Sequence, residues 1–76
     1  MGIGKPNDKF LIALGKRVRK IRLEKNLSMD DLAYECDLEK SQIYRIENGK
    51  ISPQVKTVKI IADGLKVSLS ELFDGI

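Results

Sequence analysis

Residues 38–50, LEKSQIYRIENGK, place side chains that form directed hydrogen bonds at helical spacing. If Ile43 faces a core, an advance of about 100° per residue brings Ile46 to the same side and turns Ser41 and Arg45 away. The major groove of DNA admits a helix and presents base edges, and arginine can donate two parallel hydrogen bonds to guanine there. The spacing therefore predicts an outward polar strip suited to reading base pairs.

The residues predicted to contact bases lie on the outward side or flanks of this helix. They are Lys40, Ser41, Gln42, Tyr44 and Arg45. Lysine can donate to guanine or to a phosphate, and glutamine can pair with adenine through two hydrogen bonds. The alternative is a solvated surface, but such a surface usually carries paired Glu and Lys. The residue types here favour contact with nucleic acid.

The elements that position this segment are expected to be helices, because apolar residues recur at helical spacing and no segment alternates over strand length. Four helices are predicted at about 8–25, 28–36, 40–48 and from Ser52-Pro53 onward, and a short fifth begins at Ser68. The fold class is therefore all-α. Residues 1–7, with two Gly and one Pro, are expected to be a flexible arm before a single domain at 8–76.

Apolar stripes on these helices predict the core. In the first helix the stripe is Phe10, Leu14, Val18 and Ile21. In the second it is Leu32, Ala33 and Cys36, and the lone cysteine is expected to be a small buried hydrophobe. In the fourth it is Val55, Val58, Ile61, Ala62 and Leu65. These stripes predict one core shared by all helices.

Local signals place the second and third helices close together. Ser28 is a good N-cap, with Asp31 three residues on. Asn48-Gly49 ends the third helix, since glycine tolerates the left-handed conformation. About three residues join the two helices, so residues 28–48 are a candidate helix-turn-helix.

Glu47 lies at the margin of the buried stripe of its helix, and Arg22 flanks the stripe of the first helix. A carboxylate and a guanidinium at two core margins predict a partly buried ion pair between the helices. Such a pair can fix geometry more than it stabilises the fold. The alternative is two separate solvated charges.

The composition limits the classes of function that this chain can have. The net charge of +3 is uneven, since residues 1–25 hold eight Lys/Arg and two acids while the rest holds six and nine. A basic segment favours an anionic partner such as nucleic acid. One cysteine and no histidine argue against a metal site and remove the commonest general base. We expect no enzyme activity, no cofactor and no small-molecule ligand.

The chain also lacks targeting signals. No stretch approaches the roughly 20 apolar residues of a membrane span, and the N-terminus lacks the apolar segment of a secretory signal. We expect no membrane contact and a cytoplasmic, nucleoid-associated protein.

Residues 14–73 resemble the phage-repressor/Cro-type helix-turn-helix proteins, also called XRE-like. The matching stretches are LGKRVRKIRLEKNLSMDDLA and LEKSQIYRIENGKISPQVKTVKIIADGLKVSLSELF. The resemblance implies a five-helix, lambda-repressor-like domain that binds double-stranded DNA as a transcriptional regulator, with Lys40, Ser41, Gln42, Tyr44 and Arg45 reading bases and an Arg22–Glu47 pair. It places a second set near phosphates, to which we add Asn48. That set is Ser28, Met29, Asn48, Lys50 and Gln54.

Three residues depart from the family pattern. Asp37 stands where the turn usually has Gly, although Asp tolerates the left-handed conformation better than most residues. Glu39 replaces the usual Ser or Thr cap and brings a carboxylate near phosphate. Met29 stands where Gln often donates to phosphate, so only its backbone N–H remains at the positive end of the helix.

A small stand-alone domain of this kind is similar to restriction–modification controller proteins, to small repressors and to antitoxins. Useful specificity usually needs a homodimer on two half-sites about 34–36 Å apart, which implies a palindromic operator. The predicted dimer surface is apolar and C-terminal. It consists of Leu69, Leu72, Phe73 and Ile76. Two alternatives stay open: that these residues only seal the core, and that the main partner is another protein.

Overall fold

Five helices follow one another in the computed structural model, which describes residues 2–3 and 8–76. The helices are α1 Lys9–Glu24, α2 Met29–Cys36, α3 Lys40–Glu47, α4 Val55–Leu65 and α5 Leu69–Leu72. Two short strands, β1 Gly2–Ile3 and β2 Ile51–Ser52, pair antiparallel. The predicted helical fold class is confirmed, with this strand pair as an addition.

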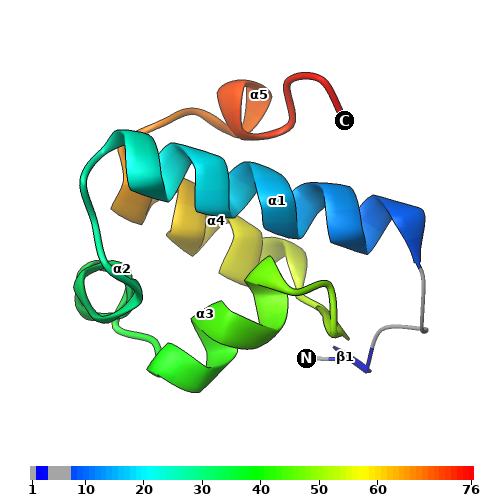
Figure 1. The fold of residues 1–76 in the computed structure, drawn as a ribbon, viewed down its shortest axis with the longest axis horizontal. Helices are drawn as coiled ribbons and strands as arrows, with labels where there is room; N and C mark the ends of the chain where they lie inside the picture. Colours follow the sequence, from blue (N-terminus) through cyan, green and yellow to red (C-terminus); the bar gives the residue numbers. More distant parts are fainter. Residues whose placement is uncertain (1, 4–7) are drawn as a thin grey trace.

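Helix α1 crosses the whole molecule, and the other helices pack around it (Figure 1). In that view α3 lies below α1, α5 lies above it, and α4 lies behind. α2 packs against both α3 and α4. α2 and α3 are thus held at one edge of the bundle, where their outward sides are not covered by another helix.

Every helix contributes to a single core. The buried apolar residues are Leu11, Leu14, Val18, Ile21, Leu32, Ala33, Cys36, Ile43, Ile46, Val58, Ile61, Ala62, Leu65 and Leu72. This set includes most of the predicted stripes and all of the stripe of α2. The core is therefore built from the sides of the helices that the spacing indicates.

Two predicted core residues are exposed. Phe10 in α1 is 53% exposed and Val55 in α4 is 80% exposed. Both lie in the first turn of their helix, at the edge of the bundle, and Leu11 is buried in α1 in place of Phe10. The prediction for these two residues is wrong, because helical spacing identifies a side of a helix and not the length over which neighbouring helices cover it.

Most helix ends follow the local signals. Ser28 accepts a hydrogen bond from the Asp31 N–H (3.0 Å), and Asp31 accepts one from the Ser28 N–H (2.9 Å). Asp37 takes the left-handed conformation at φ 53°, as expected for a residue that replaces Gly in the turn. Gly49 has φ 67° after the end of α3. These ends set the short connection between α2 and α3.

The start of α4 differs from the prediction. Its N-cap is Gln54, and not Ser52 followed by Pro53 at the first helical position. Ser52 is instead extended in β2, where it is paired with Gly2. The strand pairing keeps residues 51–52 out of the helix, so α4 begins two residues later than expected.

The arm predicted over residues 1–7 lies mostly outside the described residues. Its described part, Gly2–Ile3, forms β1 beside the connection between α3 and α4. No helix among the described residues is long and apolar enough to cross a membrane.

Candidate nucleic-acid interface

Helix α3 has one buried side and one exposed side. Ile43 and Ile46 are buried, whereas Ser41, Tyr44 and Arg45 are exposed. Residues three and four apart share a side of a helix, so the two isoleucines anchor α3 while the polar residues face outward. The orientation expected from the spacing is the one observed.

The N-terminal end of α3 has its own polar contacts. Lys40 Nζ lies 3.4 Å from Asp30 Oδ2, and both side chains are exposed. Ser41 Oγ donates to Glu39 Oε2 at 3.3 Å, and the Glu39 N–H donates to Gln42 Oε1 at 3.0 Å. Lys40, Ser41 and Gln42 are thus engaged locally in the unbound chain. Binding to bases would exchange these exposed contacts for new ones.

Arg45 differs, because no hydrogen bond or ion pair joins its side chain to the described residues. It lines an open groove of about 490 Å³ along the outward side of α3, together with Met29, Tyr44 and Lys50. The groove gathers residues from α2, α3 and the connection that follows. Predicted base-reading and phosphate-contacting residues therefore share one surface.

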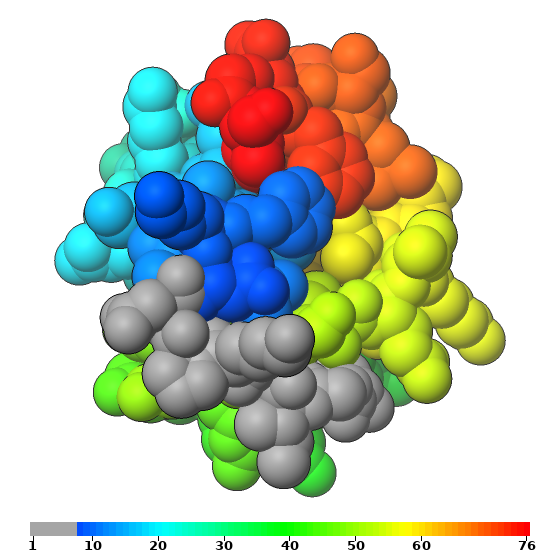
Figure 2. Space-filling model, turned by 90° about the vertical axis from the view of Figure 1, so that its right-hand side faces the viewer, coloured from blue at the N-terminus to red at the C-terminus, as the bar shows by residue number. Residues whose placement is uncertain are grey.

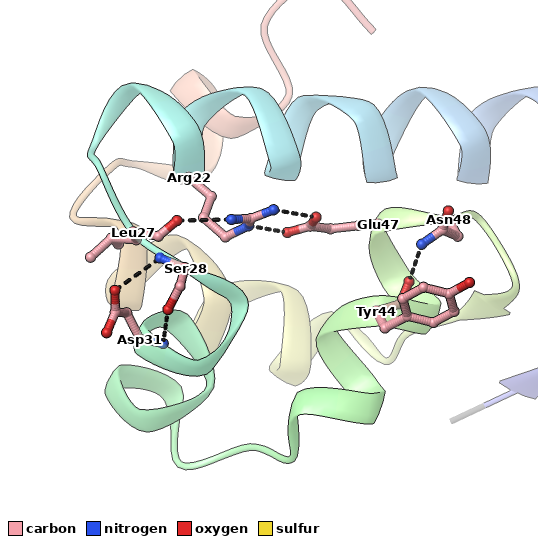
Figure 3. A network of polar contacts seen from close by, with 7 residues as sticks. All are labelled: Arg22, Leu27, Ser28, Asp31, Tyr44, Glu47 and Asn48. Atoms are coloured by element: carbon pink, nitrogen blue, oxygen red, sulfur yellow. Dashed lines mark hydrogen bonds and ion pairs between the residues drawn. The ribbon is translucent and has the colours of Figure 1, made fainter.

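Two of the predicted phosphate-contacting residues, Met29 and Lys50, line this groove. Ser28 caps α2, where its hydroxyl oxygen accepts from the Asp31 N–H. Asn48 Nδ2 donates to the Tyr44 carbonyl oxygen at 2.8 Å, across the end of α3 (Figure 3). Lys50 and Gln54 are exposed and Met29 is half-buried. Met29 and Lys50 thus border the outward side of α3, and Asn48 lies at its end.

The cap of α2 also changes the pKa of a nearby carboxyl group, that of Asp31. The backbone N–H of Ser28, followed by its hydroxyl, lowers the pKa of the Asp31 carboxyl below its usual value. Asp31 is therefore ionised at neutral pH, and its capping contribution is lost only as the pH falls through that lowered pKa.

A buried ion pair orients α3 against α1. Arg22 Nε lies 2.7 Å from Glu47 Oε2, and Arg22 Nη2 donates to Glu47 Oε1 at 3.0 Å. Arg22 Nη1 also donates to the Leu27 carbonyl oxygen at 2.8 Å (Figure 3). Three donors of one guanidinium thus join α1, the end of α3 and the residue before the α2 cap. This is the pair anticipated from the two core margins.

A glycine allows α1 and α3 to approach closely. A Cβ atom on Gly15 would overlap the backbone carbonyl oxygens of Ile46 and Glu47. Only a residue without a side chain fits where α1 crosses the last turn of α3. Gly15 and the Arg22–Glu47 pair together set the position of the outward strip.

Cys36 takes no part in this surface. It is buried, and its Sγ donates to the Ile60 carbonyl oxygen at 3.6 Å. Burial, followed by the charges of Glu35 and Asp63, raises the pKa of its thiol to about 11. Such a thiol is unreactive at neutral pH. Among residues 8–76 no group of three or more metal-ligating side chains comes together.

A second surface is only partly predicted by the sequence. The start of α1, the start of α4 and α5 enclose an apolar groove of about 210 Å³, lined by Phe10, Val55, Leu69 and Phe73 among others. Figure 2 shows these three segments meeting on one face. The rings of Phe10 and Phe73 stack with centroids 6.3 Å apart. The sequence indicates Leu69 and Phe73 of this surface, whereas its apolar stripes place Phe10 and Val55 in the core.

The predicted dimer residues do not all reach this surface. Leu69 and Phe73 line the groove, and Ile76 is exposed. Leu72 is fully buried in the core, so its side chain has no surface to offer a partner. Leu72 is corrected to a core residue, because it faces α1 and α4 while its neighbours on α5 face outward.

Comparison with known proteins agrees with this geometry. The sequence model of the family described as HTH_3, helix-turn-helix, matches residues 18–72. The chain belongs to the helix-turn-helix family. The matched residues run from the middle of α1 to the end of α5 and include both α2 and α3.

Two similar proteins, one known from its sequence and one from a solved structure, are controller proteins. Control protein C.MunI of Mycoplasma sp. is 38% identical over 66 residues, which cover 86% of this chain and 89% of the relative. The restriction-modification controller protein C.AhdI of Aeromonas hydrophila has a TM-score of 0.83 at 29% identity, covering 86% of this chain and 98% of that one.

A third similar protein has been solved with DNA. C.Esp1396I, a restriction-modification controller protein, was solved as a tetramer in complex with its natural 35-base-pair operator. It is 34% identical to this chain with a TM-score of 0.80, and the match covers 84% of each chain. The resemblance to controller proteins is confirmed.

Proposed function

We propose that this chain is a sequence-specific, double-stranded-DNA-binding transcriptional regulator that places α3 in the major groove. The observation that carries this function is the orientation of α3, with Ile43 and Ile46 buried and Ser41, Tyr44 and Arg45 exposed. The Arg22–Glu47 pair holds that orientation. Membership of the helix-turn-helix family and the similarity to C.Esp1396I, solved on its operator, support it.

The chain acts as a homodimer on a palindromic operator. One α3 contacts only a few base pairs, and two copies on half-sites about 34–36 Å apart multiply the specificity. The apolar groove at the starts of α1 and α4 and on α5 is the proposed dimer surface, because exposed aromatic and branched residues gather there. Leu69 and Phe73 remain in this surface, joined by Phe10 and Val55, whereas Ile76 is exposed outside the groove.

The proposed roles of the polar residues follow their position. Arg45 and Lys40 donate to guanine or to nearby phosphates, and Ser41, Gln42 and Tyr44 contact neighbouring bases. Ser28, the Met29 backbone, Asn48, Lys50 and Gln54 contact phosphates, which fix register without reading sequence. Such a regulator would act in the cytoplasm, on the nucleoid.

A second candidate function is an antitoxin-like module whose main partner is another protein. The apolar groove favours it, since exposed apolar surface also suits a different chain. The two functions differ in their response to salt. DNA binding weakens with log K falling by about 0.9 per unit of log salt for each phosphate neutralised, whereas an apolar interface responds little.

Selection of bound sequences from a random DNA pool tests the proposed function. We expect a palindrome whose half-site spacing matches one helical turn or a multiple of it. Binding to that palindrome should weaken steeply as salt rises. Recovery of no preferred sequence, with salt-insensitive binding to a protein, would favour the antitoxin-like alternative.

A further inference from the structure

Besides the apolar groove and the groove along α3, another groove lies between α1 and the C-terminal half of α3, with a volume of about 450 Å³. α1 contributes Lys16 and Arg19 to its lining, and α3 contributes Tyr44 and Asn48. Met29 and Tyr44 also line the groove along the outward side of α3. The two grooves therefore meet at Met29 and Tyr44 and form one continuous surface.

The groove between α1 and α3 carries a positive charge. Lys16 and Arg19 are exposed, and no salt bridge among residues 8–76 involves either of them. The one carboxylate in the lining belongs to Glu47, whose side chain is 1% exposed and is paired with Arg22. The groove thus presents two cations to solvent, and its lining has no exposed carboxylate to compete with them.

The N-terminus of α2, at the edge of the groove, lacks cations of its own for binding a phosphate. A helix N-terminus attracts anions, but α2 carries Asp30 and Asp31 in its first turn. The Met29 thioether cannot donate a hydrogen bond. Cations on a neighbouring helix would offset these two carboxylates when a phosphate approaches.

We propose that Lys16 and Arg19 of α1 bind phosphate of the DNA backbone beside the major groove that α3 occupies. This role rests on the proposed function and extends the contact surface beyond the helix-turn-helix to α1. A helix seated in the major groove has a phosphate backbone on each flank, and cations there add affinity but no sequence preference. The two cations line one groove with Tyr44 of the base-reading strip and with Asn48 at the end of α3, so α1 meets the flank nearest that end.

Salt titration of operator binding tests this role. The double variant Lys16→Gln/Arg19→Gln should bind more weakly and reduce the slope of log K against log salt by about 1 for each cation that contacts a phosphate. Its preference among operator sequences should not change. The matched control is Lys20→Gln/Lys25→Gln, which removes two exposed charges from the same helix and its end but none from this groove.

The conservative variant Arg19→Lys should keep most of the slope, since it retains the charge. Thermal melting of all variants checks that the exposed substitutions leave the fold intact. Equal slopes for the two double variants, or no change in either, would overturn the α1 role while leaving the proposed function in place. A wild-type chain that binds no DNA would overturn both.

Discussion

Arg45 is the base-reading candidate whose guanidinium has no partner among the described residues. It can therefore bind a base edge without first breaking a contact. Arg45→Ala should cost about 1–3 kcal/mol of binding free energy and relax discrimination at one base position. Titration against the selected operator and its single-base variants measures both effects. Lys50→Ala is the comparison, and we expect it to lose the same binding affinity on every DNA sequence. If Arg45→Ala also lost the same affinity on every sequence, that result would argue against base reading.

Asp30 restrains Lys40 through an exposed pair at 3.4 Å and adds a carboxylate to the binding surface. Asp30→Asn should tighten operator binding, because Lys40 is released and repulsion of phosphate is removed. Asp63→Asn is a matched control, since Asp63 pairs with Lys59 on α4 in a similarly exposed bridge away from this surface. Operator affinity at fixed salt distinguishes the two variants, and unchanged affinity for Asp30→Asn would show that the pair does not restrain Lys40.

At the scale of the elements, one ion pair joins α1 to α3. Arg22→Ala leaves the Glu47 carboxylate buried without its partner, and breaking a buried pair in this way costs about 3–5 kcal/mol. A loss of that size is a large part of the stability of a small domain. Chemical denaturation should show a much lower midpoint. An unchanged midpoint would mean that the pair contributes nothing to the fold in solution.

Gly15 affects the same contact between α1 and α3, but through its lack of a side chain and not through a charge. Alanine is the better helix former, so helix propensity alone predicts that Gly15→Ala stabilises α1. The added Cβ would overlap two carbonyl oxygens of α3, and overpacking of this kind costs about 1–3 kcal/mol. We expect a net loss of stability and weaker operator binding, because α3 must shift. A higher melting temperature would show that the contact is looser than the structure indicates.

At the scale of the whole molecule, the apolar groove is the proposed dimer surface. Phe10→Ser should weaken dimerisation, because Phe10 lines the groove and is 53% exposed. Leu23→Ser is a closely matched control on the same helix, at 52% exposed and outside the groove. Sedimentation over a range of concentrations measures the dimer constant of each. A dimer unaffected by Phe10→Ser, or equally affected by both changes, would place the interface elsewhere.

Local signals accounted for most of the elements that form the candidate site. The cap at Ser28, the left-handed turn at Asp37 and the glycine at the end of α3 are each dictated by neighbours in sequence. The same holds for the outward position of Arg45, since helical spacing places it opposite Ile43. Local chemistry was therefore enough to predict the helix-turn-helix and its exposed strip.

Other features depend on segments far apart in the chain. α4 begins later than expected because residues 51–52 pair with residues 2–3. Phe10 and Val55 are exposed because no helix among residues 8–76 extends over their ends of the bundle. The groove between α1 and α3 depends on how these two helices cross, and Gly15 lets them approach closely at that crossing.

The sequence by itself determined which residues form helices and which side of each helix is apolar, since both depend on neighbours within one or two turns. Only the tertiary structure decided how far each apolar side is covered and which polar sides lie next to one another. Coverage depends on the length and crossing of helices that are distant in sequence. For this reason the base-reading strip and the C-terminal part of the apolar groove were predictable, whereas the place of Phe10 and Val55 in that groove and the basic groove between α1 and α3 were not.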